Sequence, residues 1–412
     1  MKLPELQEKY FALWAAIFPI LTFLVVPSIQ GTTPTYLMAL LSFCWVPFIR
    51  RDKAALYMRN LLLFGGLWLA FLLVSQLGIY FSGVQTLPKT IMVDYKDDKL
   101  LFRTSLFTQS IYLFACYFTF LFFVYVYQSE WQKHLFIGAW ILVLYGLYEW
   151  VYFFVMQQPG DFLSNRIFLG GEHPGSWSQT FQLGKVNLLR IKSTTGEPSM
   201  FALTAIPYLI LSLSAKRWYL ATALLAALVL TFSTSAFLSL GLLAAYSFFY
   251  FKAWRGRYLP YWLAAGVAVV SLYFLNPELT EVLFEKKLSG EGGSGGLRKY
   301  FFETAWYTWL NSGFINKLVG IGFGNAFITP LIGGMLVNTG ILGLGIFLCA
   351  FIYPFWKLPN TTDCWPIKAG LLVVFFMLTV SLAEFAYPTS WLVLGLAYRK
   401  LRRMGSSLVQ PH

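Results

Sequence analysis

The chain has 412 residues, of which 58% are hydrophobic and only 12% are charged. A soluble domain carries roughly a quarter charged residues, so a soluble fold could not bury this much apolar surface, and we expect an integral membrane protein. The formal net charge is +13, but basic residues near the ends of membrane spans set orientation and say little about partners. Composition therefore excludes an ordinary soluble enzyme and gives no support to nucleic-acid binding.

Apolar stretches long enough to cross the hydrocarbon layer recur along the chain, and within lipid only a helix satisfies their backbone groups. We predict a single transmembrane domain over residues 1–412 with about twelve helices. The predicted spans are residues 10–27, 34–49, 60–82, 106–127, 135–156, 199–214, 219–233, 235–251, 259–275, 331–356, 369–384 and 387–400. The first apolar run lacks a small-residue cleavage pattern, so we predict that it remains as an anchor.

Four basic clusters fall in short loops or in the C-terminal tail. They lie at residues 50–59, 216–217, 252–257 and 399–403. With twelve spans every cluster falls on one side, which the positive-inside rule identifies as the cytoplasm, together with both termini. An odd number of spans would place half of the clusters outside.

Three long segments lie on the opposite side of the predicted membrane, at residues 83–105, 157–198 and 276–330. They contain 13 of the 31 lysines and arginines. Long loops cross the membrane regardless of their charge, so the predicted orientation stands. The cations in these outer loops therefore need another explanation.

The segment at residues 189–199 carries charges from the second outer loop straight into a predicted span. It contains Arg190, Lys192 and Glu197, and Pro198 suits the first turn of the following helix. Glu197 would then precede that helix, beside the positive end of its dipole. A helix cap with cations that reach to the membrane surface explains the segment equally well.

A second charged segment lies in the third outer loop. Arg298 begins a predicted amphipathic helix that presents Phe302, Ala305 and Trp309 on one face. Such a helix could lie along the membrane surface and hold its arginine over the bundle. The alternative is an interfacial helix whose charges are simply solvated.

Six short motifs follow one another along the chain from residue 190 onwards. They are Arg190 with Gly196, Glu197, Pro198 and Ser199; Ser233 with Ser235; Arg298; Gly320 with Gly322 and Gly324; Gly340 with Gly343; and Pro388 with Trp391. Each motif is common by itself. Their order and their placement relative to the spans resemble the O-antigen polymerase and ligase superfamily of bacterial envelope glycosyltransferases.

The resemblance implies an all-α, GT-C-type fold in the bacterial inner membrane, with residues 157–198 and 276–330 as periplasmic loops and the active site facing the periplasm. It implies a glycan donor linked to undecaprenyl diphosphate, a lipid-linked acceptor, no cofactor, and a chain-length regulator protein as a further partner. By position, Arg190 and Arg298 would stabilise the departing diphosphate. Sugar transfer also needs a base for the acceptor hydroxyl, and Glu197 is the candidate.

One departure from the family pattern favours a polymerase over a ligase. Ligases of this family carry a histidine shortly before the Gly-x-x-Gly span, and residues 328–335 contain none. His173, in the second outer loop, is an alternative base or substrate contact, although a lone loop histidine is more often solvated. Further candidates for contact with phosphate or sugar acids are Arg166, Lys185, Lys192 and Lys299, each of which could equally be a solvated loop charge.

Two glutamates near the outer ends of predicted spans are further candidates. Glu149 is an ionisable residue inside an apolar segment, which favours a functional role. Glu384 could orient an arginine or simply form a turn. The Asp97–Asp98 pair has lysines on both sides and is a poor cation ligand, so we expect no metal site.

The leading hypothesis is an inverting, metal-independent polymerase that moves a growing glycan from undecaprenyl diphosphate onto a lipid-linked repeat. One alternative is a ligase that moves the finished glycan to another acceptor. A second alternative is a flippase or transporter of the lipid-linked sugar, which should place its cations within the spans.

Overall fold

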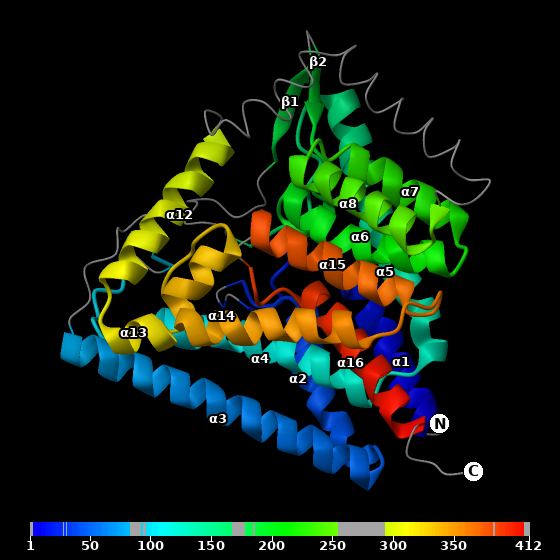
Figure 1. The fold of residues 1–412 in the computed structure, drawn as a ribbon. Coiled ribbons are helices and arrows are strands. Elements are labelled where there is room, and N and C mark those ends of the chain that lie inside the picture. The colour runs from blue at the N-terminus through cyan, green and yellow to red at the C-terminus, as the bar shows by residue number, and fades with distance from the viewer. Residues whose placement is uncertain are drawn as a thin grey trace.

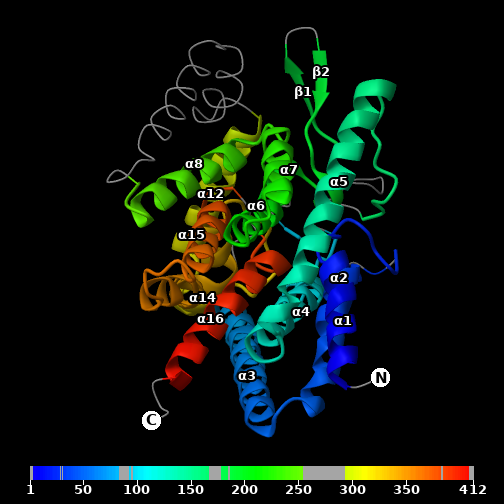
Figure 2. The same ribbon diagram turned by 90° about the vertical axis from the view of Figure 1, so that its right-hand side faces the viewer.

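The computed structural model describes residues 3–27, 29, 31–82, 92–93, 96–166, 178–183, 186–253, 293–381 and 384–407. This part of the chain is mostly helical (Figures 1 and 2). Four helices are long and apolar enough to cross a membrane: α3 (Arg51–Ser82), α4 (Thr104–Tyr125), α5 (Gln132–Met156) with the turn before it, and α14 (Leu331–Lys357). The protein is therefore a mostly α-helical membrane protein.

Shorter helices fill the rest of the bundle. The apolar ones are α2 (Pro34–Leu41), α6 (Pro198–Ser214), α7 (Trp218–Val229), α8 (Thr234–Tyr250) and α15 (Trp365–Val380), and they are accompanied by α1 (Leu3–Ile17) and α16 (Pro388–Ser407). Most of these helices coincide with predicted spans to within a few residues. The predicted span at residues 259–275 and the start of the predicted loop at 276–330 lie outside the described residues, so the number of spans stays a prediction.

The first predicted span, at residues 10–27, is helical only as far as Ile17. Pro19 lacks an amide hydrogen and disfavours helical geometry in the residue before it. The chain beyond it bonds to other loops instead: the amides of Leu21 and Thr22 both donate to the carbonyl of Thr194, at 2.9 and 3.2 Å. The prediction of a single helix over the whole stretch is therefore wrong.

The basic clusters gather at one end of the bundle. The guanidinium of Arg402 lies 4.7 Å from the ring centroid of Tyr125, and Lys53, at the start of α3, is within electrostatic range of the same arginine. Arg217 lies 5.4 Å from the ring centroid of Phe136, near the start of α5. Three clusters that are far apart in sequence thus lie at the same end of the bundle, while the side of the membrane that this end faces stays a prediction.

The predicted outer amphipathic helix is α12 (Gly293–Asn311), which leans across one end of α14 (Figure 1). Its Ala305 is fully buried against a small apolar cluster that includes Ile328, and Trp309 is partly buried. Phe302, which was predicted on the same face, remains 37% exposed. The inward face is therefore centred on Ala305 and differs slightly from the predicted one.

The turn after α13 (Phe314–Val319) packs backbone to backbone against α14. The helix kinks at Gly340, where φ is 64° and ψ is −169°. A Cβ atom at Gly340 would lie 2.3 Å from the carbonyl oxygen of Leu318, and one at Gly320 would lie 2.3 Å from the backbone of Asn338. Only glycine at both positions permits this approach.

Replacing Gly340 with alanine should lower the melting temperature of the detergent-solubilised protein. The new Cβ would collide with backbone, in a conformation that costs an L-residue about 1–3 kcal/mol. Gly345→Ala on the same helix is the matched control, because a Cβ there meets nothing within 4 Å and alanine favours a helix. Equal melting temperatures for Gly340→Ala and the wild type would contradict the role assigned to this glycine.

Candidate functional site

A β-hairpin positions Arg190. Strands β1 (Thr180–Leu183) and β2 (Val186–Leu189) pair antiparallel, and Arg190 follows β2 directly. Its amide donates to the carbonyl of Gln179 at 2.9 Å, its Nη1 donates to the side-chain oxygen of Gln179, and its Nε donates to the carbonyl of Thr231 at 3.0 Å. The hairpin, which the all-α prediction did not include, therefore fixes the guanidinium between two loops.

Glu197 occupies the predicted place before α6. Its backbone is extended (φ −146°, ψ 161°), and Pro198 is the first helical residue. The carboxylate makes no capping bond to the helix amides and instead accepts a hydrogen bond from the hydroxyl of Ser199. Gly196 precedes it with φ 102°, a conformation that favours glycine. The carboxylate is thus held at the helix start through Oε1, and no hydrogen bond to Oε2 is found among the described residues.

Arg298 joins these residues from α12, where its Nη2 donates to the hydroxyl of Ser381 at 3.2 Å. Burial lowers the pKa of Arg190 to about 10, an effect that Glu197 opposes and Arg298 increases. Burial also lowers the pKa of Arg298, and Glu197 again opposes the change. The three predicted catalytic side chains therefore lie within electrostatic range of one another, with one more positive than negative charge, an arrangement that attracts anions.

Arg166 lies beside this group. Its guanidinium is 5.5 Å from the ring centroid of Tyr112, and its Nη1 donates to the carbonyl of Leu21 at 3.3 Å. Burial alone would lower the pKa of Arg166, but Tyr112 and Glu384 raise it above its usual value. Burial raises the pKa of Glu384, with Arg166 opposing the shift and Glu197 adding to it. Glu384 is therefore a neighbour of both Arg166 and the catalytic candidates.

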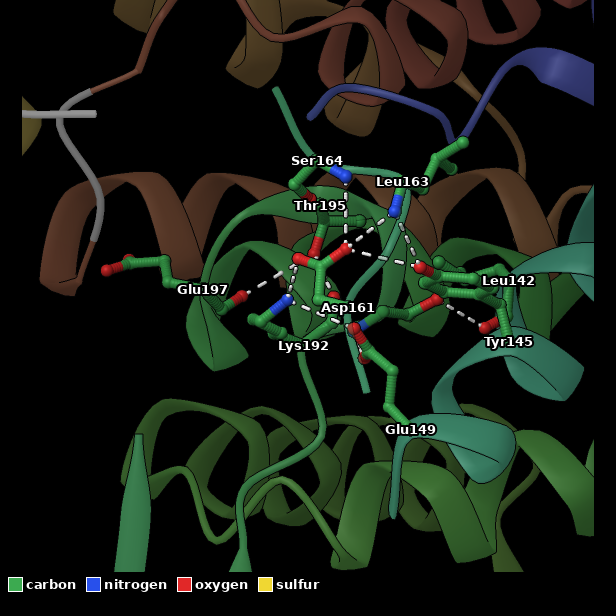
Figure 3. Close-up of polar contacts among 10 residues, drawn as sticks. Leu142, Tyr145, Glu149, Asp161, Leu163, Ser164, Lys192, Thr195 and Glu197 are labelled. Carbon is green, nitrogen blue, oxygen red and sulfur yellow. Dashed lines mark hydrogen bonds and ion pairs between the residues drawn. The ribbon is translucent and has the colours of Figure 1, made fainter. Parts of the chain in front are cut away.

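Lys192 is enclosed within the protein (Figure 3). Its Nζ lies 3.0 Å from Oε1 of Glu149 and 2.5 Å from Oδ2 of Asp161, and its side chain is 1% exposed. Glu197 points away from this cluster in the same view. The ammonium is thus already neutralised, and Lys192 holds the fold around the site rather than facing a ligand. Glu149, predicted as a functional candidate, has the same internal role.

Asp161 was not singled out in the sequence, because its distance along the chain from its partners follows no helical or strand spacing. The signal that could have led to it is Glu149. A carboxylate inside an apolar span needs a buried cation, and a buried lysine with two acidic neighbours is one solution. The search for a partner of Glu149 would have reached Lys192 and, through it, Asp161.

The other predicted contacts are placed apart from the cluster or are not described. Lys299 is exposed on α12, while Lys185 and His173 lie outside the described residues. Within the described ranges, no group of three or more His, Cys, Asp or Glu side chains could hold a metal ion. The cationic side chains that the described residues place at this site are those of Arg166, Arg190 and Arg298.

An apolar cavity of about 330 Å³ lies between α3, α4, α14 and α16. The polar side chains in its wall are all hydrogen-bonded within the protein; they are Trp68, Ser110, Tyr117, Asn338, Thr339, Trp391 and Tyr398. We call this cavity the apolar slot. Its lining includes Phe385, which follows Glu384 directly, so the slot reaches the neighbourhood of the arginines. A wall of this kind suits an apolar occupant.

Comparison with models of known protein families gave no match, and neither did comparison with curated proteins or with solved structures.

Lys192→Met should strongly destabilise the protein. It leaves two carboxylates in the interior without their cation, and removing one partner of a buried pair costs about 3–5 kcal/mol. Lys299→Met, at an exposed position of α12, should change stability by less than about 0.5 kcal/mol. Thermal unfolding in detergent tests the difference, and equal stability of the two variants would show that the two carboxylates do not need the ammonium of Lys192.

Proposed function

We propose that the chain is a membrane glycosyltransferase, an inverting polymerase that moves a growing glycan from undecaprenyl diphosphate onto a lipid-linked repeat. The observation that carries the proposal is that Arg190, Arg298 and Glu197 lie within electrostatic range of one another. Glu384 lies within range of Glu197, and the next residue, Phe385, lines the apolar slot. A cationic site beside an apolar slot suits an anion with a long hydrocarbon tail. The order of the sequence motifs supports a glycan as the transferred group, because the family that this order resembles uses glycan donors linked to a lipid diphosphate.

The two arginines would bind the diphosphate leaving group. A guanidinium presents a planar fork of donors that matches phosphate oxygens, and charge that develops on the leaving group is best stabilised by donors fixed in advance. Arg190 is fixed in this way by Gln179 and Thr231, and Arg298 by Ser381. Each guanidinium retains further donors for a ligand.

The proposed reaction is a single displacement at the anomeric carbon of the donor sugar. The acceptor hydroxyl oxygen bonds to this carbon while its bond to the diphosphate oxygen breaks, and the electron pair of that bond leaves with the diphosphate. The hydroxyl proton passes to Glu197. Attack from the face opposite the leaving group inverts the configuration. Glu197 also lies within electrostatic range of Arg190, so its charge favours the guanidinium at this place.

The placement of the cations favours an enzyme over a flippase. Arg190 follows the hairpin, Arg166 lies in a loop, and Arg298 belongs to the outer helix α12. A protein that carries a charged headgroup across the membrane needs compensating charges along the spans. These three arginines instead lie together beside one end of the bundle, where a reaction at the membrane surface would use them.

Arg190→Ala and Arg298→Ala should each reduce polymer formation by about a hundredfold or more, the loss typical of removing one donor that stabilises a developing anion. Lysine at either position should restore only part of the activity, because it keeps the charge and loses the fork. The measurement is a product ladder from purified protein and a defined lipid-linked repeat in liposomes. Lys317→Ala, on α13 and outside the arginine group, is the control.

Wild-type chain lengths in both arginine variants at equal expression would refute the proposed site. The same liposomes separate the alternatives. Translocation of the lipid without sugar transfer would identify a flippase, and transfer only to an acceptor that is not a lipid-linked repeat would identify a ligase.

Filling the apolar slot should weaken the use of long-chain donors specifically. The slot extends over about 12 Å from Phe64 to Leu72, at 1.5 Å per helical residue, and Ala350 lies in its wall. Ala350→Trp should raise KM about tenfold for a long-chain lipid diphosphate donor and leave KM for a short-chain donor unchanged. Cys349→Trp, at the adjacent exposed position, is the matched control. An equal change in KM for both donors would contradict binding of the lipid tail in the slot.

A further inference from the structure

Three charged side chains from separate segments meet in the interior (Figure 3). Glu149 comes from α5, Asp161 from the loop after α5, and Lys192 from the segment between β2 and α6. Their side chains are 1%, 8% and 1% exposed, respectively. One ammonium faces two carboxylates, so the cluster holds one excess negative charge. We call it the buried charge cluster.

Hydrogen-bond donors offset the excess negative charge. Oδ1 of Asp161 accepts bonds from the amide of Ser164 at 3.0 Å and from the hydroxyl of Tyr145 at 3.2 Å. Oε2 of Glu149 accepts a bond from the amide of Ser193 at 2.9 Å. Bonds of this kind to an ionised acceptor are stronger than neutral ones. Because the two amides belong to different loops, the cluster fixes both loops at once.

The two loops that the cluster joins carry the arginines. Asp161 is five residues before Arg166, and Lys192 is two residues after Arg190 and five before Glu197. A small movement at the cluster would therefore be passed directly to the site.

Backbone hydrogen bonds of Thr22 also connect these two loops. The carbonyl of Thr22 accepts a bond from the amide of Arg166 at 3.1 Å, and the amide of Thr22 donates to the carbonyl of Thr194 at 3.2 Å. The stretch beyond Pro19 thus runs between the loop of Arg166 and the segment of Arg190. The backbone link and the buried charge cluster therefore connect the same two segments.

Ser193 adopts a backbone conformation that the cluster helps to maintain. Its φ is 52°, a left-handed value that is unfavourable for a residue other than glycine. Its amide bonds to Glu149, and its hydroxyl donates to the carbonyl of Leu142 at 2.7 Å. Strained backbone of this kind persists where the surroundings over-determine it, and it is concentrated at functional sites.

We infer that Glu149, Asp161 and Lys192 are positioning residues, which hold the loop of Arg166 against the segment that carries Arg190 and Glu197. The inference rests on the proposed function, in that the arginines form the site for a diphosphate. Buried ions are an inefficient source of stability, because neutral residues of similar shape often stabilise a fold as well or better. Alignment of the two loops is what neutral residues would not reproduce.

The test compares two neutralised variants. The first is the triple variant Glu149→Gln, Asp161→Asn and Lys192→Met, which removes every charge of the buried cluster and leaves no ion unpaired. The second is Glu8→Gln with Lys133→Met, which neutralises a half-exposed pair at the other end of α5, where the two charges are 2.7 Å apart. Each purified variant is measured for melting temperature, for affinity for farnesyl diphosphate, and for sugar transfer.

The triple variant should melt close to the wild type, bind farnesyl diphosphate at least tenfold more weakly, and show at least a tenfold lower kcat. The Glu8 and Lys133 variant should match the wild type in all three measurements. Wild-type affinity and kcat in a folded triple variant would overturn the inference and leave the cluster with a structural role alone. If the triple variant does not fold, the single variant Asp161→Asn tests the inference instead. It leaves Lys192 paired with Glu149 and frees only the loop of Arg166, so unchanged affinity there would overturn the inference too.

The affinity measurement separates this inference from the proposed function. If the wild type binds farnesyl diphosphate but transfers no sugar, the proposed polymerase activity fails while the comparison of affinities still tests the positioning role. Arg190→Ala supplies the reference affinity for a disrupted arginine site. If the wild type transfers sugar and the folded triple variant does so equally well, the proposed function stands and the positioning role fails.

Discussion

An ammonium group in the interior of an apolar bundle needs oxygen acceptors around it, and this constraint organises the region between the hairpin and α6. Lys192 meets the constraint with one acid from α5 and one from the loop that follows α5. Both carboxylates are in turn satisfied by amides of the two loops that they join. The ion pairs of Lys192 therefore fix the segment that carries Arg190 and Glu197, whether or not a ligand is bound.

The arginines and the apolar slot suit two different parts of one kind of ligand, a diphosphate that carries a hydrocarbon tail. A diphosphate needs fixed donors, and the arginines are held by backbone and side-chain oxygens of neighbouring loops. A hydrocarbon tail needs a wall without unsatisfied polar groups, and the slot between α3, α4, α14 and α16 supplies one. Glu384 and Phe385 join the two regions, because the first belongs to the charged group and the second to the slot.

The glycine motifs take on a physical role in this arrangement. Gly320 and Gly340 allow the turn after α13 to touch the kinked part of α14, and Gly322 and Gly343 lie in the wall of the slot. Larger side chains at these positions would push the turn away from α14 and alter the shape of the slot. The serine motif has a comparable place, since Ser233 and Ser235 bond to each other at 2.8 Å in the turn whose Thr231 carbonyl holds Arg190.

The sequence by itself determined the features that depend on local physics. Long apolar runs become α3, α4, α5 and α14 because lipid tolerates only helices, and Pro198 starts α6 with Glu197 before it. Arg298 lies on a helix as predicted, but α12 begins five residues earlier, at Gly293. Only the tertiary structure determined which residues each charged side chain contacts. Lys192 looked like Arg190 in the sequence, yet it pairs with Glu149 and Asp161 in the interior, while Arg190 stays with the site. Pairings between residues so far apart along the chain leave no periodic signal, because they depend on how the loops fold back over the bundle.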